Sequence, residues 1–141
     1  MLPRFACLVV GVLLFAGVPL RAQDPVAEAQ AIISRQITAF LADDEASAYA
    51  QAAPNMRNGI TDKATFLRMI RERYRPVYRA RRYAFGRSKL IGGGELILQE
   101  VLITDRAGND WTALFEMRLM DDGIYRVNGV RLSRNVASQG I

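Results

Sequence analysis

The sequence predicts an α+β domain in which N-terminal helices cover one face of a curved antiparallel β-meander of about four strands. Apolar residues recur at helical spacing from residue 25 to residue 74, and then alternate with polar residues at a period of two. Two short polar segments that contain glycine interrupt the alternating half and read as hairpin turns. Because the helices come before the strands, they must cover one face of the resulting sheet.

The first residues have the layout of a secretory signal peptide. Arg4 precedes an unbroken apolar run from Phe5 to Val18, and Pro19 separates this run from Ala22 and the polar residues that follow. The run is shorter than the roughly 20 residues that span a bilayer, which favours a cleaved signal over a membrane anchor. We therefore expect a signal peptide over residues 1–22, cleavage near Ala22, and export to the periplasm or secretion.

Composition excludes several kinds of chemistry from the predicted mature chain. The only cysteine, Cys7, lies within the signal peptide, and the chain contains no histidine. A thiol nucleophile, a disulfide, the commonest general base and the commonest zinc ligand are therefore missing, and we expect neither a metal nor a cofactor. The remaining length fits one domain with a packed core over residues 23–134, followed by a frayed tail over residues 135–141.

Proline and acidic residues mark the ends of the expected helices. Asp24 and Pro25 begin the first helix, because Asp can cap free amides and Pro suits the first helical position. Its buried stripe is formed by Val26, Ile33, Ile37, Phe40 and Leu41. We expect a second helix over residues 46–53 that Pro54 ends. A third follows Thr61-Asp62 and stops near Tyr74, because Pro76 disfavours helical geometry at Arg75.

The alternating half predicts four strands and two hairpin turns. The strands are expected over residues 77–85, 95–104, 111–120 and 124–132, and the second should be central because it is apolar on both faces. Gly92–Gly94 forms the first connection, and residues 105–110 and 121–123 form the turns. Gly129 is a candidate bulge at which a curved sheet tightens.

Positive charge is concentrated where the helical pattern gives way to the alternating pattern. From Lys63 to Lys89 there are ten Lys or Arg residues and one acidic residue, Glu72. Such a segment can attract anions at long range. The candidate anion-binding residues are Arg68, Arg71, Arg75, Arg79, Arg81 and Arg82. The alternative is that these arginines are solvated on helix and strand faces.

Several segments together resemble a bacterial exported domain of unknown function. That domain is in turn similar to the nuclear-transport-factor-2-like, cystatin-like cone superfamily. The resemblance spans roughly residues 33–132 and implies an abridged cone fold, since no hairpin lies between the second and third helices. It implies little about activity, because the superfold hosts isomerases, dehydratases and binding modules alike. The segments that carry it are residues 39–44, 48–54, 66–69, 74–78, 111–114 and 121–129.

Three functional hypotheses follow. The favoured one is a non-catalytic module, expected to be a homodimer, that binds a protein partner or a small apolar or anionic ligand through Tyr49, Tyr74, Tyr78, Gln99 and Asn128. Export disfavours nucleic acid as a partner.

The second hypothesis is suggested by the isomerase members of the cone superfamily. It is a proton-transfer enzyme with Glu100 or Glu116 as the base and Tyr74 or Tyr78 as the hydrogen-bond donor. A structural role of these polar residues is the alternative. The third hypothesis is binding of an anionic surface, such as phospholipid headgroups, through the arginine-rich stretch over residues 68–82.

Overall fold

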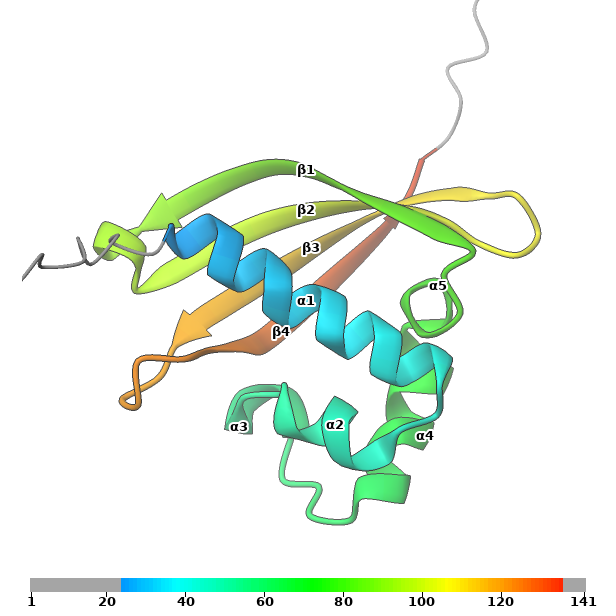
Figure 1. Cartoon of the computed structure of the whole chain (residues 1–141). Helices are drawn as coiled ribbons and strands as arrows, with labels where there is room; N and C mark the ends of the chain where they lie inside the picture. The colour runs from blue at the N-terminus through cyan, green and yellow to red at the C-terminus, as the bar shows by residue number, and fades with distance from the viewer. Residues whose placement is uncertain (1–23, 136–141) are drawn as a thin grey trace, which may run out of the picture.

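A computed structural model describes residues 24–135 and confirms the α+β class (Figure 1). The helices are α1 (Pro25–Leu41), α2 (Glu45–Ala50), α3 (Pro54–Arg57), α4 (Lys63–Arg73) and α5 (Arg75–Tyr78). The strands are β1 (Arg82–Ile91), β2 (Leu96–Thr104), β3 (Asp110–Leu119) and β4 (Tyr125–Arg134), and a short 3-10 helix, η1 (Gly92–Gly94), joins β1 to β2. Consecutive strands pair antiparallel in the order β1-β2-β3-β4, as the predicted meander requires.

Acidic side chains cap the three longer helices at their N-termini. The Asp24 carboxylate accepts a hydrogen bond from the amide of Val26 at 3.0 Å, which begins α1 where the sequence predicts it. Asp44 and Asp62 begin α2 and α4 in the same way, since each accepts from the amide three residues later. These bonds satisfy amides that have no partner within the helix.

Two prolines begin short helices that the sequence analysis did not predict. The second expected helix is shorter, because α2 ends at Ala50, and Pro54 is the first residue of α3. The strand expected from Val77 is likewise wrong at its start, since Pro76 lies in the first turn of α5 and β1 begins only at Arg82. The reason is the same at both sites: proline lacks an amide hydrogen, and the first turn of a helix does not need one.

The core lies between α1 and one face of the sheet, here called the inner sheet face. Strand alternation turns Ile97, Val101 and Phe115 toward the helices, and all three are fully buried. From the other side, α1 contributes an apolar stripe to the same core cluster: Ile33, Ile37 and Phe40. The space between α1 and the sheet is therefore filled with side chains.

A bulge interrupts β4 where the sequence analysis placed one. Glu116 lies opposite Gly129 but Met117 lies opposite Val127, so Asn128 is an extra residue in β4. The Val127 amide donates to the Gln51 carbonyl and the Ala53 amide donates to the Val127 carbonyl, both at 2.8 Å. The segment that contains Gln51 and Ala53 therefore covers part of the free edge of β4. A bulge and a covered edge both discourage pairing with another strand.

Some expectations fall outside the described residues. The signal peptide over residues 1–22 lies outside them, and so does the predicted frayed tail except for Asn135, whose amide donates to the Asp110 carbonyl at 2.9 Å. Within residues 24–135, no helix is long and apolar enough to cross a membrane.

The core predicts the effect of truncating a single inner side chain. Phe115 is fully buried at the centre of β3, so Phe115→Ala should lower the free energy of unfolding by about 3–5 kcal/mol. Ile124, which is 45% exposed beside the β3–β4 turn, is the control, and Ile124→Ala should change stability much less. Chemical denaturation followed by circular dichroism measures both. Equal losses for the two variants would contradict this assignment of the core.

Candidate anion-binding cleft

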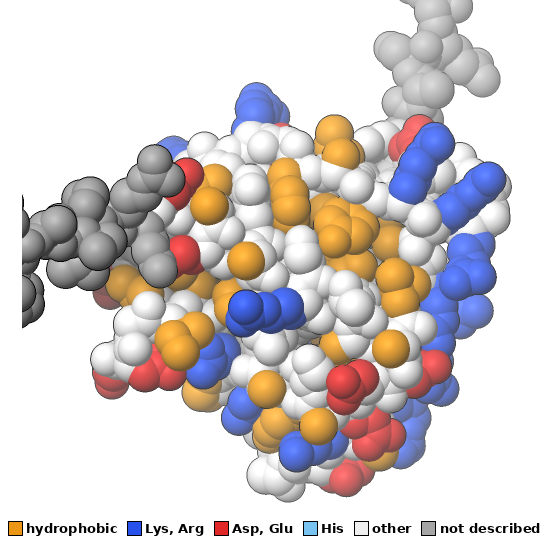
Figure 2. Space-filling view, in the orientation of Figure 1, with side chains coloured by type: hydrophobic (Ala, Val, Ile, Leu, Met, Phe, Trp, Pro, Cys, Tyr) orange, Lys and Arg blue, Asp and Glu red, His pale blue; other side chains and the backbone are white. Residues whose placement is uncertain are grey.

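A cleft of about 790 Å³ opens between α4 and α5 on one side and the β2–β3 turn on the other. Its apolar part includes Pro76 of α5 and two residues of the inner sheet face, Trp111 and Leu132. Charged side chains surround this apolar part, namely Arg73, Arg75, Arg79, Arg106, Glu72 and Asp105. Figure 2 shows Lys and Arg side chains gathered on the side where Figure 1 places α5 and the β2–β3 turn.

Asp105 fixes the indole of Trp111 in the cleft. The indole Nε1 donates a hydrogen bond of 2.9 Å to one carboxylate oxygen, and the backbone amides of Ala107 and Asn109 donate to the other at 2.9 Å. The hydrogen bond from Trp111, followed by those from Asn109 and Ala107, holds the pKa of Asp105 below its usual value. Asp105 is therefore an ionised acceptor that shapes the β2–β3 turn and orients the tryptophan.

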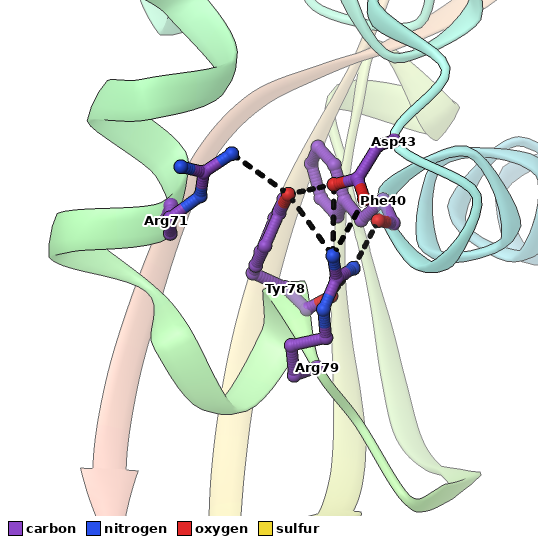
Figure 3. Close-up of polar contacts among 5 residues, drawn as sticks. All are labelled: Phe40, Asp43, Arg71, Tyr78 and Arg79. Carbon is purple, nitrogen blue, oxygen red and sulfur yellow. Dashed lines mark hydrogen bonds and ion pairs between the residues drawn. The ribbon is translucent and has the colours of Figure 1, made fainter.

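A polar cluster anchors Arg79 at the back of the cleft (Figure 3). One guanidinium nitrogen contacts both carboxylate oxygens of Asp43 at 2.8 Å, and the other donates to the Phe40 carbonyl. The guanidinium also lies 4.1 Å from the ring centroid of Tyr78, whose hydroxyl donates to Asp43. Arg71 donates to the same hydroxyl at 3.3 Å. The cluster ties the end of α1 to α4 and α5, and it commits Arg79 to a structural ion pair.

Three other cleft arginines are not held in an ion pair within the described residues. Arg73, Arg75 and Arg106 are exposed, and within residues 24–135 none of them forms an ion pair. These three arginines outnumber the two carboxylates of the lining, Glu72 and Asp105, so the cleft has an excess of positive charge beside an apolar surface. Arginine suits carboxylate and phosphate ligands, since its planar fork donates two hydrogen bonds at once.

The six arginines of the predicted anion-binding set do not form one patch. Arg75 and Arg79 line the cleft, where they are joined by Arg73 and Arg106, which the set omitted. The other four lie elsewhere: Arg68 is exposed on α4, Arg71 contacts Tyr78, Arg81 lines a hollow with Leu41 and Ala80, and Arg82 donates to Thr104. Helix and strand geometry scatter them, as alternating directions along a strand require.

The candidate ligand-binding residues have structural partners and do not line the cleft. The Tyr49 hydroxyl donates to the Ile60 carbonyl at 2.8 Å, and Gln99, which is fully buried, donates to the Glu100 carbonyl at 2.9 Å. Asn128 donates to Glu116 at 3.1 Å. Tyr78 belongs to the Arg79 cluster, and Tyr74 is the C-terminal cap of α4. The space between the helices and the inner sheet face is thus occupied by the core.

The proton-transfer hypothesis lacks its required geometry. Glu100 and Glu116 point to the outer sheet face, the face opposite the helices, whereas Tyr74 and Tyr78 lie on the helical side. The hydrogen bond from Arg87 holds the pKa of Glu100 below its usual value. The prediction that a glutamate and a tyrosine share a pocket is therefore wrong. Residues alternate between the two faces along a strand, and both glutamates occupy positions on the outer sheet face.

The cleft residues that sequence reasoning missed include Arg73, Arg106, Trp111 and Leu132. Their proximity depends on the β2–β3 turn meeting α5, and no local pattern indicates that contact. The one usable signal is a lone tryptophan at the start of a strand beside an arginine-containing turn. Within residues 24–135, no group of three or more His, Cys, Asp or Glu side chains could hold a metal ion.

A family model matches most of the chain. The chain belongs to the family described as a domain of unknown function (DUF4864), whose family model matches residues 22–140. No curated protein and no solved structure matches the chain significantly. The predicted resemblance to a domain of unknown function is thus confirmed at the level of this family, whereas export and the relationship to the cone superfamily stay predictions.

The lowered pKa of Asp105 predicts an acid-dependent loss of stability. Because this pKa is lower in the folded chain than in the unfolded chain, the carboxylate adds to the free energy of unfolding above the unfolded pKa. That contribution disappears as the pH falls through the folded pKa. The stability difference between wild type and Asp105→Asn should therefore be largest near neutral pH and shrink in acid.

Denaturation across the acidic pH range, followed by Trp111 fluorescence and by circular dichroism, measures this difference. Asp121→Asn is the matched control, because Asp121 accepts no side-chain hydrogen bond within the described residues and lies in the β3–β4 turn. A stability difference for Asp105→Asn that is constant with pH would contradict the assigned role.

Proposed function

We propose that this member of the DUF4864 family is an exported, non-catalytic module that binds a small anion with an apolar body in the cleft beside Trp111. One observation carries the proposal: three exposed arginines surround an apolar surface that a fixed indole provides. The cleft volume of about 790 Å³ lies within the roughly 300–1,000 Å³ of small-molecule sites. The ligand class is a carboxylate or phosphate attached to an aromatic or aliphatic group.

The arrangement supplies two kinds of binding energy from different residues. Arg73, Arg75 and Arg106 offer guanidinium donors to the charged end of a ligand. The indole of Trp111 and the side chain of Leu132 offer an apolar surface to the rest of it. Neither inorganic phosphate nor a neutral hydrocarbon would use both, so the ligand should combine the two properties.

The carboxylates at the cleft support binding better than catalysis. Asp105 is ionised and accepts hydrogen bonds from Trp111 and from backbone amides, and Asp43 is paired with Arg79. A general base works best with a pKa near the operating pH, whereas the pKa of Asp105 moves in the opposite direction. Asp105 instead positions the indole that would contact the ligand, and Asp43 holds Arg79 in a structural ion pair.

The proposal also includes export of the protein and a relationship to the cone superfamily. The signal-peptide pattern over residues 1–22 supports cleavage near Ala22 and a periplasmic or secreted protein. Helices packed on one face of an antiparallel meander support a relationship to the nuclear-transport-factor-2-like cone superfamily. The homodimer expected from the sequence stays a prediction, which the measurement of oligomeric state described below addresses.

Binding can be followed with the chain's own tryptophan. Trp111 is the only tryptophan, so its fluorescence reports directly on the cleft. We would titrate the mature protein with octanoate, benzoate and phenyl phosphate, using octanamide, benzamide and inorganic phosphate as matched probes that lack one of the two properties. We expect a saturable change in Trp111 fluorescence with octanoate, benzoate and phenyl phosphate, and none with the three matched probes. Equal responses to charged and neutral probes would contradict the proposal.

Charge reversal in the cleft should abolish most of this binding. Arg75→Glu or Arg106→Glu should weaken phenyl phosphate binding roughly tenfold or more, because a hydrogen bond to a charged group contributes about 1.5–3 kcal/mol. Arg68→Glu is the matched control, since it makes the same charge change on an exposed face of α4 outside the cleft. Isothermal titration calorimetry measures all three variants, and equal weakening by Arg68→Glu would indicate only a long-range charge effect.

Anionic vesicles distinguish a lipid surface from a soluble ligand. The two sources share the same phosphate chemistry, so the mature protein should be sedimented with phosphatidylglycerol vesicles and with phosphatidylcholine vesicles at low and raised salt. If the ligand is a soluble anion, binding of phenyl phosphate persists while neither vesicle type retains the protein. Retention on phosphatidylglycerol vesicles alone, lost on Arg106→Glu, would instead support the anionic-surface hypothesis.

A further inference from the structure

The outer sheet face carries a row of leucines that no described helix covers. All described helices pack on the inner sheet face, as Figure 1 shows, while β2 and β3 turn alternate residues the other way. Four of these outward residues are Leu96, Leu98, Leu102 and Leu114. Leu102 is 46% exposed, and the other three are half-buried. Apolar side chains left uncovered on a sheet face, here with Glu100 and Glu116 between them, are typical of a protein interaction site.

The bulge in β4 forms a small hollow in this face. A cavity of about 200 Å³ is lined by Leu98, Leu114, Glu116, Gly129, Val130 and Arg131. Gly129 has no side chain to fill it, and a Cβ atom there would meet only Glu116, at 4.0 Å. The hollow could therefore accept one apolar side chain of a partner between Leu98 and Leu114.

The charges on the outer sheet face identify the kind of partner. Of its three strand carboxylates, Glu100 pairs with Arg87 at 2.9 Å, Glu116 accepts from Asn128 and Asp110 accepts from Thr104. Three cations on the same face, Lys89, Arg118 and Arg131, are exposed and form no ion pair within residues 24–135. A second copy of this chain would bring like charges together, whereas an acidic partner would complement them.

We propose that the outer sheet face docks an acidic segment of another protein. The segment inserts one apolar side chain into the hollow at Gly129 and places carboxylates against Lys89, Arg118 and Arg131. This surface is separate from the cleft at Trp111, because the hollow lies on the opposite face of the sheet and shares no lining residue with the cleft. The inference is therefore independent of the proposed small-anion ligand.

Synthetic peptides of defined pattern test the proposal on the mature protein. The probe alternates Glu and Leu, one control peptide alternates Lys and Leu, and a second alternates Glu and Ser. In ¹H–¹⁵N correlation spectra, only the Glu-Leu peptide should shift the amides of Leu98, Leu114 and Gly129, and raised salt should weaken the effect. Shifts confined to the cleft, or equal shifts with the Lys-Leu peptide, would overturn the proposal.

Filling the hollow gives the sharper test. Gly129→Val should weaken Glu-Leu peptide binding about tenfold or more while leaving phenyl phosphate binding unchanged, and Arg131→Glu should weaken the peptide similarly. The substitution is sterically tolerable, since the nearest atom to the added Cβ is at ordinary contact distance. Ala84→Val places the same final side chain elsewhere on the outer sheet face and should bind the peptide normally.

Two further measurements distinguish the proposed peptide site from the cleft and from a contact between two copies of the chain. Arg106→Glu should leave peptide binding intact, so loss of peptide binding in this variant would overturn the proposal even if the small-anion site is real. Analytical ultracentrifugation should give the same oligomeric state for the unliganded wild type and for Gly129→Val, because the proposal places no dimer contact on this face. A dimer that Gly129→Val dissociates would overturn the acidic partner and assign the face to a second copy of the chain.

Discussion

The side chains of α1 and of the inner sheet face form one apolar layer, and the other elements are positioned by their contact with it. Ile33 and Phe40 of α1 and Phe115 of β3 are all essentially inaccessible to solvent. Burial of this kind is the main favourable term in folding, so the helix cannot leave the sheet without a large loss of stability. Because the interior is filled, ligands and partners can bind only to surfaces outside this layer.

The layer leaves two chemically different surfaces uncovered. The cleft at Trp111 lies where α5 and the β2–β3 turn meet the end of the sheet, and it combines arginines with an indole. The outer sheet face combines leucines with cations around a hollow at Gly129. The first is concave and sized for a small molecule, whereas the second is broad and suits a protein segment. One small domain can therefore present two independent binding surfaces.

Local pairing of acids explains why both surfaces are positive although the net charge is modest. Asp43 pairs with Arg79, Asp105 accepts from Trp111, and Glu100 pairs with Arg87. Ion pairing with arginine offsets the charge of Asp43 and Glu100. Asp105 keeps its charge because its donors are neutral, but the cleft arginines outnumber it. The remaining arginines then dominate the field at the cleft and across the outer sheet face.

The sequence by itself determined the features that depend on neighbouring residues. Acidic caps, hairpin turns, strand alternation and the bulge at Gly129 all follow from local geometry, and the structure confirms each of them. Only the tertiary structure decided that Trp111 and Arg106 meet Arg75 across a cleft, and that Asp43 pairs with Arg79. These arrangements join segments far apart in the chain, and their energies come from packing and charge pairing that no local pattern of residues records.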